Sequence, residues 1–338
     1  MNLAHLLART ARVLPEQPAV ALGTRELYSY GELFRRAAKI AGGLRGLMGL
    51  QTGDRVALFM TNCPQYLELL YGIWHAGLVA VPINHKLHAR EVAFIVDDSA
   101  AALLFVADDP GEDERIWREK NSDLRVVPVD AATYRRLTSA DPIAIVPRTP
   151  DDLAWLFYTS GTTGQPKGVM LSQRNLLAMT LAYFPDVDQV TPSDSILYAA
   201  PMSHGAGMYN FAHVLVGARH VIPESGGFDA HEIVLLSQRF RQVSLFAAPT
   251  MVRRLVDQVS ERSADCSGIK TIVYGGGPMY LEDIRRSLDV LGDRLVQIYG
   301  QGESPMTITA LSRQHLANRA HPRHRERIAS VGVAHSVV

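Results

Sequence analysis

The chain has 338 residues, which is enough for two or more packed layers and more than one subdomain. Its hydrophobic fraction of 47% and charged fraction of 20% are typical of a soluble globular enzyme, and two cysteines exclude a disulfide framework. Basic and acidic residues number 34 each, so no net charge attracts nucleic acid or an anionic membrane, and no apolar run is long enough to form a transmembrane segment.

Strand-like and helix-like segments alternate through the first half of the chain. Residues 2–13 are expected to form a surface helix; the alternative, an arginine-containing transit peptide, lacks a cleavage site, so we expect a cytoplasmic protein. Apolar residues at helical spacing predict an amphipathic helix over residues 30–47. Further predicted elements are a helix over residues 65–75 and buried strands over 55–60, 78–83, 101–106 and 125–129.

The second half continues the same alternation. A proline-rich surface connection over residues 142–152 leads into a strand at 153–157, and a helix is predicted over 171–183. Four more buried strands are predicted over residues 196–200, 242–247, 270–274 and 294–299. This pattern indicates an α/β fold with largely parallel sheets, in which ligands bind beyond the carboxyl ends of the strands.

A loop rich in hydroxyl groups follows the strand at 153–157. Residues 158–168 read Tyr-Thr-Ser-Gly-Thr-Thr-Gly-Gln-Pro-Lys-Gly. Short hydroxyl donors, free backbone N–H groups and one cation suit a polyphosphate. The loop differs from the common nucleotide P-loop, because Lys167 lies between Pro166 and Gly168.

The order of residues in 158–168 resembles the signature of the adenylate-forming superfamily of acyl-CoA synthetases, amino-acid adenylation domains and luciferases. The resemblance implies the N-terminal core of that fold, with stacked, largely parallel sheets flanked by helices. We expect two interleaved subdomains, approximately 1–72 with 210–338, and 73–209. The residues implied to bind the phosphates of ATP are Thr159, Ser160, Gly161, Thr162, Thr163, Gly164 and Lys167.

Two further segments resemble motifs of the same family. Residues 299–303, Tyr-Gly-Gln-Gly-Glu, are similar to Tyr-Gly-x-Thr-Glu, whose tyrosine stacks on adenine and whose glutamate holds Mg²⁺. Gly302 replaces the usual threonine, so a contact to the α-phosphate is in doubt. Residues 274–279 are similar to a glycine turn that lines the adenine pocket. The residues implied to contact AMP are Gly275, Gly276, Gly277, Pro278, Tyr299, Gly300, Gln301 and Gly302.

The acid is expected to bind near two other segments. Residues 201–208 resemble a Pro-x-x-His-x-x-Gly segment whose histidine borders the substrate carboxylate, although a lone histidine is often structural. Residues 246–250 resemble another wall of the acyl pocket. The implied pocket residues are His204, Gly205, Met208, Phe246 and Ala248, and the small residues at 205–207 suggest room for the acid.

The resemblance implies an acid–thiol ligase that uses ATP, Mg²⁺ and coenzyme A. A fatty or aryl acid would be activated to an acyl-adenylate with release of pyrophosphate, and CoA would then accept the acyl group. Lys167, Glu303 and His204 are the expected catalytic residues, and Glu303 and Thr159 the expected metal ligands. Family members continue into a mobile C-terminal domain, so we expect these residues to be the core of a longer enzyme and to turn over poorly alone.

Alternative functions stay open. An amino-acid adenylation domain usually has an aspartate that meets the substrate ammonium, but residues 204–215 contain no acid, and Asp229 is interpreted as a helix cap. A non-catalytic nucleotide-binding module and a luciferase-like oxidation are further alternatives. The basic run 321–327 has no interleaved aromatics and is interpreted as a solvated loop, with no nucleic-acid partner. The oligomeric state is open, a homodimer included.

Overall fold

The computed structural model describes residues 1–160 and 165–338. The described chain divides into two compact units. Unit 1 comprises Met1–Gln17, Tyr28–Leu177 and Met202–His204, and unit 2 comprises Pro18–Leu27, Ala178–Pro201 and Gly205–Val338. This division differs from the grouping expected from the sequence, because strand β3 (Arg55–Phe59) pairs with β4 (Val79–Ile83) and β5 (Ala101–Val106), so residues 28–72 stay with 73–177.

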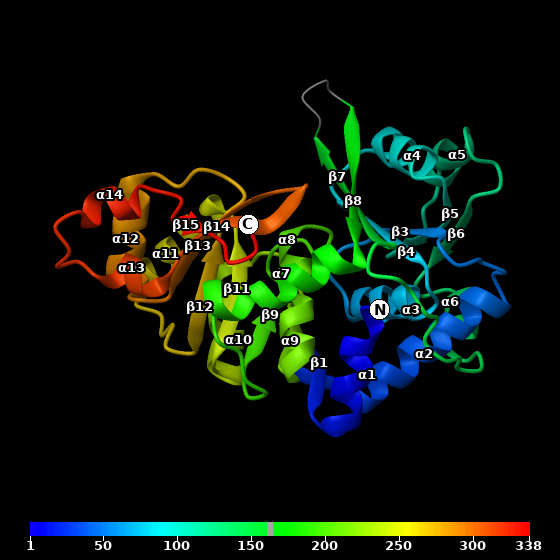
Figure 1. Cartoon of the computed structure of the whole chain (residues 1–338), viewed down its shortest axis with the longest axis horizontal. Coiled ribbons are helices and arrows are strands. Elements are labelled where there is room, and N and C mark those ends of the chain that lie inside the picture. Colours follow the sequence, from blue (N-terminus) through cyan, green and yellow to red (C-terminus); the bar gives the residue numbers. More distant parts are fainter. Residues whose placement is uncertain (161–164) are drawn as a thin grey trace. The chain divides into compact units, whose positions relative to one another are not determined.

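A six-stranded sheet in the order β6-β5-β3-β4-β7-β8 forms the centre of unit 1. The strands from β6 to β7 run parallel, and β8 is antiparallel to β7. Helices α4 and α5 cover one face, and α2, α3 and α6 cover the other (Figure 1). The remaining bounds are β6 (Arg125–Pro128), β7 (Leu153–Ser160), β8 (Pro166–Ser172), α1 (Ala4–Val13), α2 (Tyr30–Gly46), α3 (Pro64–His75), α4 (Ala89–Asp98), α5 (Asp113–Arg118) and α6 (Ala132–Thr138).

The core of unit 1 follows from strands that are covered on both faces. Such strands are apolar throughout, as in β4, where all five residues are buried. Val92 and Ile95 of α4 belong to the same buried cluster as Val81 of β4. Helix α2 begins with a capping box, in which Ser29 N donates to Glu32 Oε2 at 2.8 Å and Glu32 N donates to Ser29 Oγ at 3.3 Å.

A nine-stranded sheet in the order β15-β14-β13-β12-β11-β9-β10-β1-β2 lies in unit 2, with part of β2 in unit 1. Strands β13 to β1 in this order are parallel, β14 is antiparallel to β13, and β15 is antiparallel to β14. The strands are β1 (Pro18–Leu22), β2 (Arg25–Ser29), β9 (Ser195–Leu197), β10 (Arg219–Ile222), β11 (Val243–Ala247), β12 (Ile269–Tyr274), β13 (Leu295–Gln301), β14 (Ser304–Leu311) and β15 (Val333–Ala334). The helices are α7 (Gln173–Asp186), α8 (Gly205–Met208), α9 (Asn210–Val216), α10 (Ala230–Phe240), α11 (Pro249–Arg262), α12 (Leu281–Leu291), α13 (Arg313–Ala317) and α14 (His324–Ile328).

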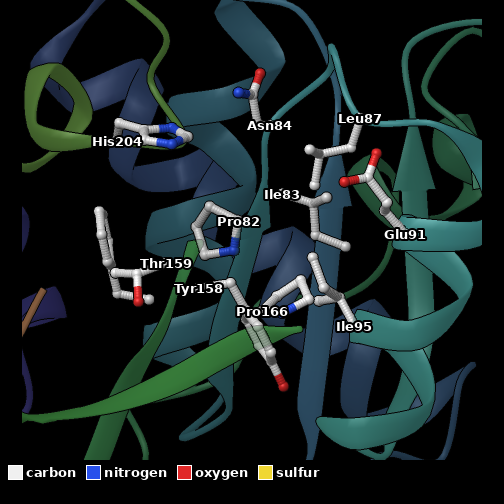
Figure 2. A pocket seen from close by; sticks show the side chains of 11 residues that line it. Pro82, Ile83, Asn84, Leu87, Glu91, Ile95, Tyr158, Thr159, Pro166 and His204 are labelled. Carbon is white, nitrogen blue, oxygen red and sulfur yellow. The ribbon is translucent and has the colours of Figure 1, made fainter. Parts of the chain in front are cut away.

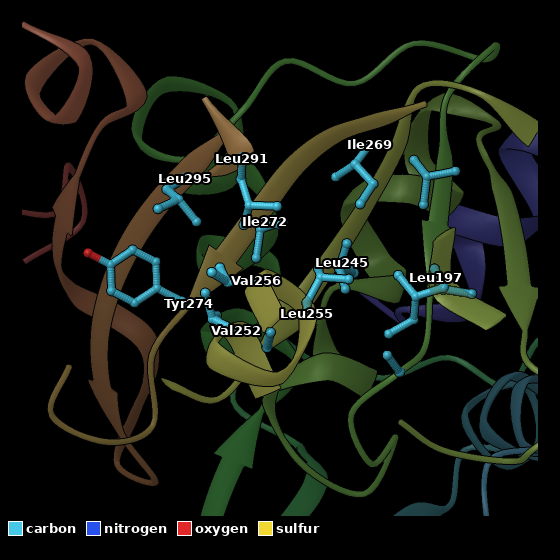
Figure 3. Close-up of a cluster of buried hydrophobic side chains, with 14 of the residues drawn as sticks. Leu197, Leu245, Val252, Leu255, Val256, Ile269, Ile272, Tyr274, Leu291 and Leu295 are labelled. Carbon is cyan, nitrogen blue, oxygen red and sulfur yellow. The ribbon is translucent and has the colours of Figure 1, made fainter. Parts of the chain in front are cut away.

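A buried hydrophobic cluster of unit 2 joins this sheet to α10, α11 and α12. Figure 3 shows Val252 and Leu255 of α11 close to the strand residues Leu245 and Ile272. Asp229 caps α10, because Glu232 N donates to Asp229 Oδ1 at 2.8 Å. This confirms the cap predicted from the sequence.

The α/β class with mostly parallel sheets is confirmed. Three local predictions were wrong in detail. The helix expected over 171–183 begins at Gln173, because residues 166–172 pair with β7 as the edge strand β8. The strand expected over 294–299 extends to Gln301 as β13, and it pairs with β14, which was not predicted. The basic run 321–327, expected to be a loop, contains the start of the short helix α14.

Candidate functional site

The hydroxyl-rich motif lies on the hairpin of β7 and β8. Thr159 is directly opposite Lys167 in the strand register, and Ser160 is opposite Pro166. The Lys167 side chain is exposed and Thr159 is half-buried. Four predicted phosphate contacts, Gly161, Thr162, Thr163 and Gly164, lie outside the described residues. The pairing therefore places a hydroxyl and an ammonium at neighbouring backbone positions at the end of the hairpin.

Two other residues of the motif have a packing role. The Tyr158 hydroxyl donates to Asp98 Oδ2 at 2.6 Å, and its ring lies against Gly168 on the opposite strand. A side chain at position 168 would place its Cβ 2.9 Å from Tyr158 Cζ, which is too close for a real contact. Burial and the Asp98 carboxylate raise the pKa of Tyr158, so its hydroxyl stays protonated. Gly168 therefore makes room for the tyrosine ring.

A cavity of about 350 Å³ lies beside the hairpin in unit 1. Figure 2 shows His204 and Thr159 on one side of this cavity and Leu87 and Glu91 on the opposite side. Its walls come from the carboxyl end of β4, from α4 and from the hairpin, with the lining residues Pro82, Ile83, Asn84, Leu87, Glu91, Ile95, Phe157, Tyr158, Thr159, Pro166 and His204. A mostly apolar cavity with a few polar groups is typical of a small-molecule site. The sequence did not indicate Asn84, Leu87 or Glu91, although their place after a buried strand was a usable signal.

His204 is held by its neighbours on the wall of this cavity. Its Nδ1 atom pairs with Ser203 Oγ at 2.9 Å, and its ring meets the edge of Phe157 with centroids 5.7 Å apart. Burial, and then the positive charge of nearby His85, lower the pKa of His204 below its usual value of 6.5. The imidazole is therefore neutral near pH 7. It can donate or accept a hydrogen bond with a ligand, but it does not supply a fixed positive charge.

The predicted adenine residues lie in unit 2, and the first group forms a turn after β12. A side chain at position 275 would place its Cβ 2.6 Å from the Ile298 carbonyl oxygen of β13. Gly276 has φ +79°, a conformation that other residues seldom adopt. Gly277 is more open, with Pro249 Cδ 3.9 Å from where its Cβ would be. The close approach at Gly275 and the positive φ at Gly276 thus both require glycine. The main chain before Pro278 is therefore not covered by side chains of its own.

The second adenine group forms the hairpin of β13 and β14. Gln301 pairs with Ser304, so Gly302 and Glu303 make the turn between them. Gln301 Nε2 donates to the Tyr299 hydroxyl at 2.9 Å, which fixes both side chains on one face. The Tyr299 side chain is 38% exposed, and Glu303 is exposed at the turn. An aromatic face and an exposed carboxylate are therefore presented within five residues.

Gly300 and Gly205 are both enclosed by the same residue of β14. A Cβ at position 300 would be 2.3 Å from Met306 N, and a Cβ at position 205 would be 2.5 Å from Met306 Sδ. Met306 has φ +68°, which is unusual for a residue with a side chain. The glycine at 205 therefore makes room for the Met306 side chain. No motif or spacing in the sequence indicates this contact.

The other predicted acyl-pocket residues of unit 2 lie at the carboxyl end of β11. Phe246 is the penultimate residue of this strand, and Ala248 is the N-cap of α11. Met208 is buried at the end of α8. The ring of Phe246 meets the edge of Tyr209, a residue not predicted, with centroids 6.2 Å apart.

The carboxylates of the described residues do not assemble a metal site by themselves. No group of three or more histidine, cysteine, aspartate or glutamate residues that could hold a metal ion occurs in the described part of the chain. A single exposed carboxylate such as Glu303 fits Mg²⁺ that arrives on a nucleotide, since Mg²⁺ usually keeps water and phosphate ligands. Every helix within residues 1–160 and 165–338 is too short or too polar to span a bilayer.

Comparisons with known proteins identify the family of the chain. The profile of the AMP-binding enzyme family matches residues 7–338. A feruloyl-CoA synthase of an Amycolatopsis species is 34% identical over 330 residues, which span 96% of this chain and 62% of that enzyme. The fatty acid–[acyl-carrier-protein] ligase ScoC of Streptomyces coeruleorubidus is 32% identical over 88% of this chain and 57% of its own length. The chain thus spans less than two thirds of these relatives.

Among solved structures, the chain is similar to the N-terminal domain of FACL13 from Mycobacterium tuberculosis. The two superimpose with a TM-score of 0.86 and are 26% identical in sequence. The superposition covers 99% of this chain and 83% of the other.

Proposed function

Because the chain belongs to the AMP-binding enzyme family, we propose that it serves the ATP-dependent activation of a carboxylic acid, either fatty or aryl. A carboxylate oxygen attacks the α-phosphorus of ATP, the bond to the bridging oxygen breaks, and pyrophosphate leaves. In the second step, the thiol of CoA attacks the acyl carbon, loses its proton and releases AMP. The feruloyl-CoA synthase supports an aryl acid, and the fatty acid–[acyl-carrier-protein] ligase supports a fatty acid.

The observation that carries this proposal is in unit 1, where Thr159 and His204 line one cavity and Lys167 lies opposite Thr159. Lys167 and the loop hydroxyls are proposed to bind the β- and γ-phosphates, where negative charge builds up as pyrophosphate leaves. His204 is proposed to orient the acid carboxylate through a hydrogen bond. A neutral imidazole suits this task, because it does not hold the nucleophile in an ion pair.

The residues of unit 2 are proposed to bind the nucleoside and the metal. Tyr299 offers an aromatic face for adenine, and the turn at Gly275–Gly277 lets main-chain groups approach the ligand. Glu303 would hold Mg²⁺, which neutralises phosphate charge when bound. Phe246 and Met208 are proposed as walls for the acid.

Exchange of radiolabelled pyrophosphate into ATP tests the first half-reaction. We expect exchange that depends on Mg²⁺ and on an added fatty or aryl acid. Exchange that responds to amino acids alone would favour the adenylation-domain alternative. ATP binding without any acid-dependent exchange would overturn the proposal in favour of a nucleotide-binding module.

A further inference from the structure

Two buried phenol hydroxyls in unit 2 have no role in the site described above. Tyr183 of α7 is 2% exposed, and Tyr209, the N-cap of α9, is 3% exposed. Neither hydroxyl has a hydrogen-bond partner within the described residues. A buried hydroxyl without a partner is costly, so native structures usually satisfy it with protein, water or a ligand.

These tyrosines belong to a continuous row of aromatic rings. Phe246 contacts Tyr209 at 6.2 Å between centroids, Tyr209 contacts Tyr183 at 5.0 Å, and Tyr183 contacts His213 at 5.6 Å, each edge to face. The row starts beside the glycine turn, because a Cβ at Gly276 would be 3.9 Å from Phe246 Cζ. It therefore leads from the proposed nucleoside residues into the interior of unit 2.

The row is neutral as well as aromatic. Burial raises the pKa of Tyr183 and of Tyr209, so both remain protonated phenols. Burial lowers the pKa of His213 to about 4, so this ring is uncharged near pH 7. The charged groups near the inner end of the row are Asp188, Asp194, Lys270 and Arg313, and they form ion pairs with one another. A flat ring would continue the edge-to-face packing, and a polar substituent on it would satisfy a hydroxyl.

We propose that the aromatic row Phe246–Tyr209–Tyr183 binds the tail of the acid, and that this acid is aromatic and carries a ring hydroxyl. The inference rests on the proposed acid activation and narrows it from fatty or aryl acids to hydroxylated aryl acids. A purely alkyl or unsubstituted aryl tail would leave the phenol hydroxyls unsatisfied in the complex. Sites built to bond a substrate hydroxyl discriminate strongly against analogues that lack it.

Binding of three non-hydrolysable acyl-sulfamoyl adenosines tests the inference on this chain by calorimetry. The acyl groups are 4-hydroxycinnamoyl, cinnamoyl and octanoyl. We expect the 4-hydroxycinnamoyl compound to bind at least about tenfold more tightly than the other two. Equal or tighter binding of the cinnamoyl or octanoyl compound would overturn the inference and leave acid activation intact. Failure of all three to bind would contradict the proposed function itself.

Tyr209→Phe and Tyr183→Phe keep the rings and remove only the hydroxyls. We expect at least one of them to reduce the preference for the hydroxylated compound about tenfold while its affinity for the cinnamoyl compound stays the same. Tyr198→Phe is the matched control, because the Tyr198 hydroxyl is buried in the same unit but bonds His220 Nδ1 at 2.7 Å. It should lower thermal stability without changing the preference. An unchanged preference in both tested variants would refute the role of the row.

Discussion

Lys167 lies directly opposite Thr159 in the antiparallel pairing of β7 and β8. The two ends of the hydroxyl-rich motif are therefore joined by strand hydrogen bonds, and cross-strand neighbours have Cβ atoms about 5 Å apart. An ammonium and a hydroxyl that start from neighbouring positions can contact the same polyphosphate. The motif therefore contains residues of both paired strands, with the hydroxyl on β7 and the ammonium on β8.

Lys167→Ala should weaken ATP binding, because it removes the cation that the hairpin places beside the proposed phosphates. A charge-assisted hydrogen bond to phosphate is worth roughly 1.5–3 kcal/mol, so we expect Kd for Mg-ATP to rise about tenfold to a hundredfold. Lys120→Ala is the control, because Lys120 is also exposed but pairs with Asp97 at 3.9 Å. Equal Kd values by calorimetry for Lys167→Ala and the unmutated protein would contradict the assignment.

Glu303→Gln should reduce the dependence of ATP binding on Mg²⁺. The substitution keeps the size of the side chain and removes the negative charge that a hard divalent cation prefers. We expect the Mg²⁺ concentration for half-maximal ATP binding to rise about tenfold or more. Glu282→Gln, on the exposed first turn of α12, should have no effect. If both variants titrate identically with Mg²⁺, Glu303 does not hold the metal.

Gly275→Ala and Gly277→Ala should differ in stability, although they are two residues apart. The first places a Cβ 2.6 Å from the Ile298 carbonyl oxygen, whereas the second meets no atom closer than 3.9 Å. Overpacking of this kind costs about 1–3 kcal/mol, and an open position costs about 0.5 kcal/mol or less. Thermal or urea unfolding of the two variants measures the difference. Equal stability would show that the backbone at 275 has space to move.

Acidification should destabilise unit 2 through His213. Burial gives His213 a folded pKa of about 4, below its unfolded pKa of about 6.5. The unfolded state therefore binds the proton first. The contribution of neutral His213 to the free energy of unfolding is fully present above about pH 6.5, and it is lost as the pH falls towards 4. The difference corresponds to about 3 kcal/mol.

His213→Gln removes this titration and should flatten the decrease of the unfolding free energy between pH 6.5 and 4. His231→Gln is the control, because His231 is exposed on α10. Urea unfolding at several pH values measures the slopes. A slope in His213→Gln equal to that of the control would mean that folding does not lower the pKa of His213.

Much of the fold could be predicted from local sequence. Strands such as β5 and β11 are covered on both faces, so they appear as apolar runs. The edge strand β8 could not be predicted, because it begins with a proline, contains a glycine and has a single buried residue, Leu171. Its strand character comes from pairing with β7, and pairing depends on a partner rather than on the segment itself.

Only the part of the site whose chemistry follows from the residue types of one segment could be predicted. Hydroxyls, glycines and a lysine in one loop indicate phosphate binding wherever the loop is placed. Met306 beside Gly205, and Tyr209 beside Phe246, depend on packing between segments far apart in the sequence. No periodicity or motif encodes these contacts.

Mass-spectrometric detection of acyl-adenylate tests the central claim most directly. The protein would be incubated with Mg-ATP and a pool of fatty, aryl and amino acids, and the products compared with those of Lys167→Ala. The account predicts an aryl or fatty acyl-adenylate that is reduced in the variant. An aminoacyl-adenylate, or a pool in which no acid is converted although ATP binds, would contradict it.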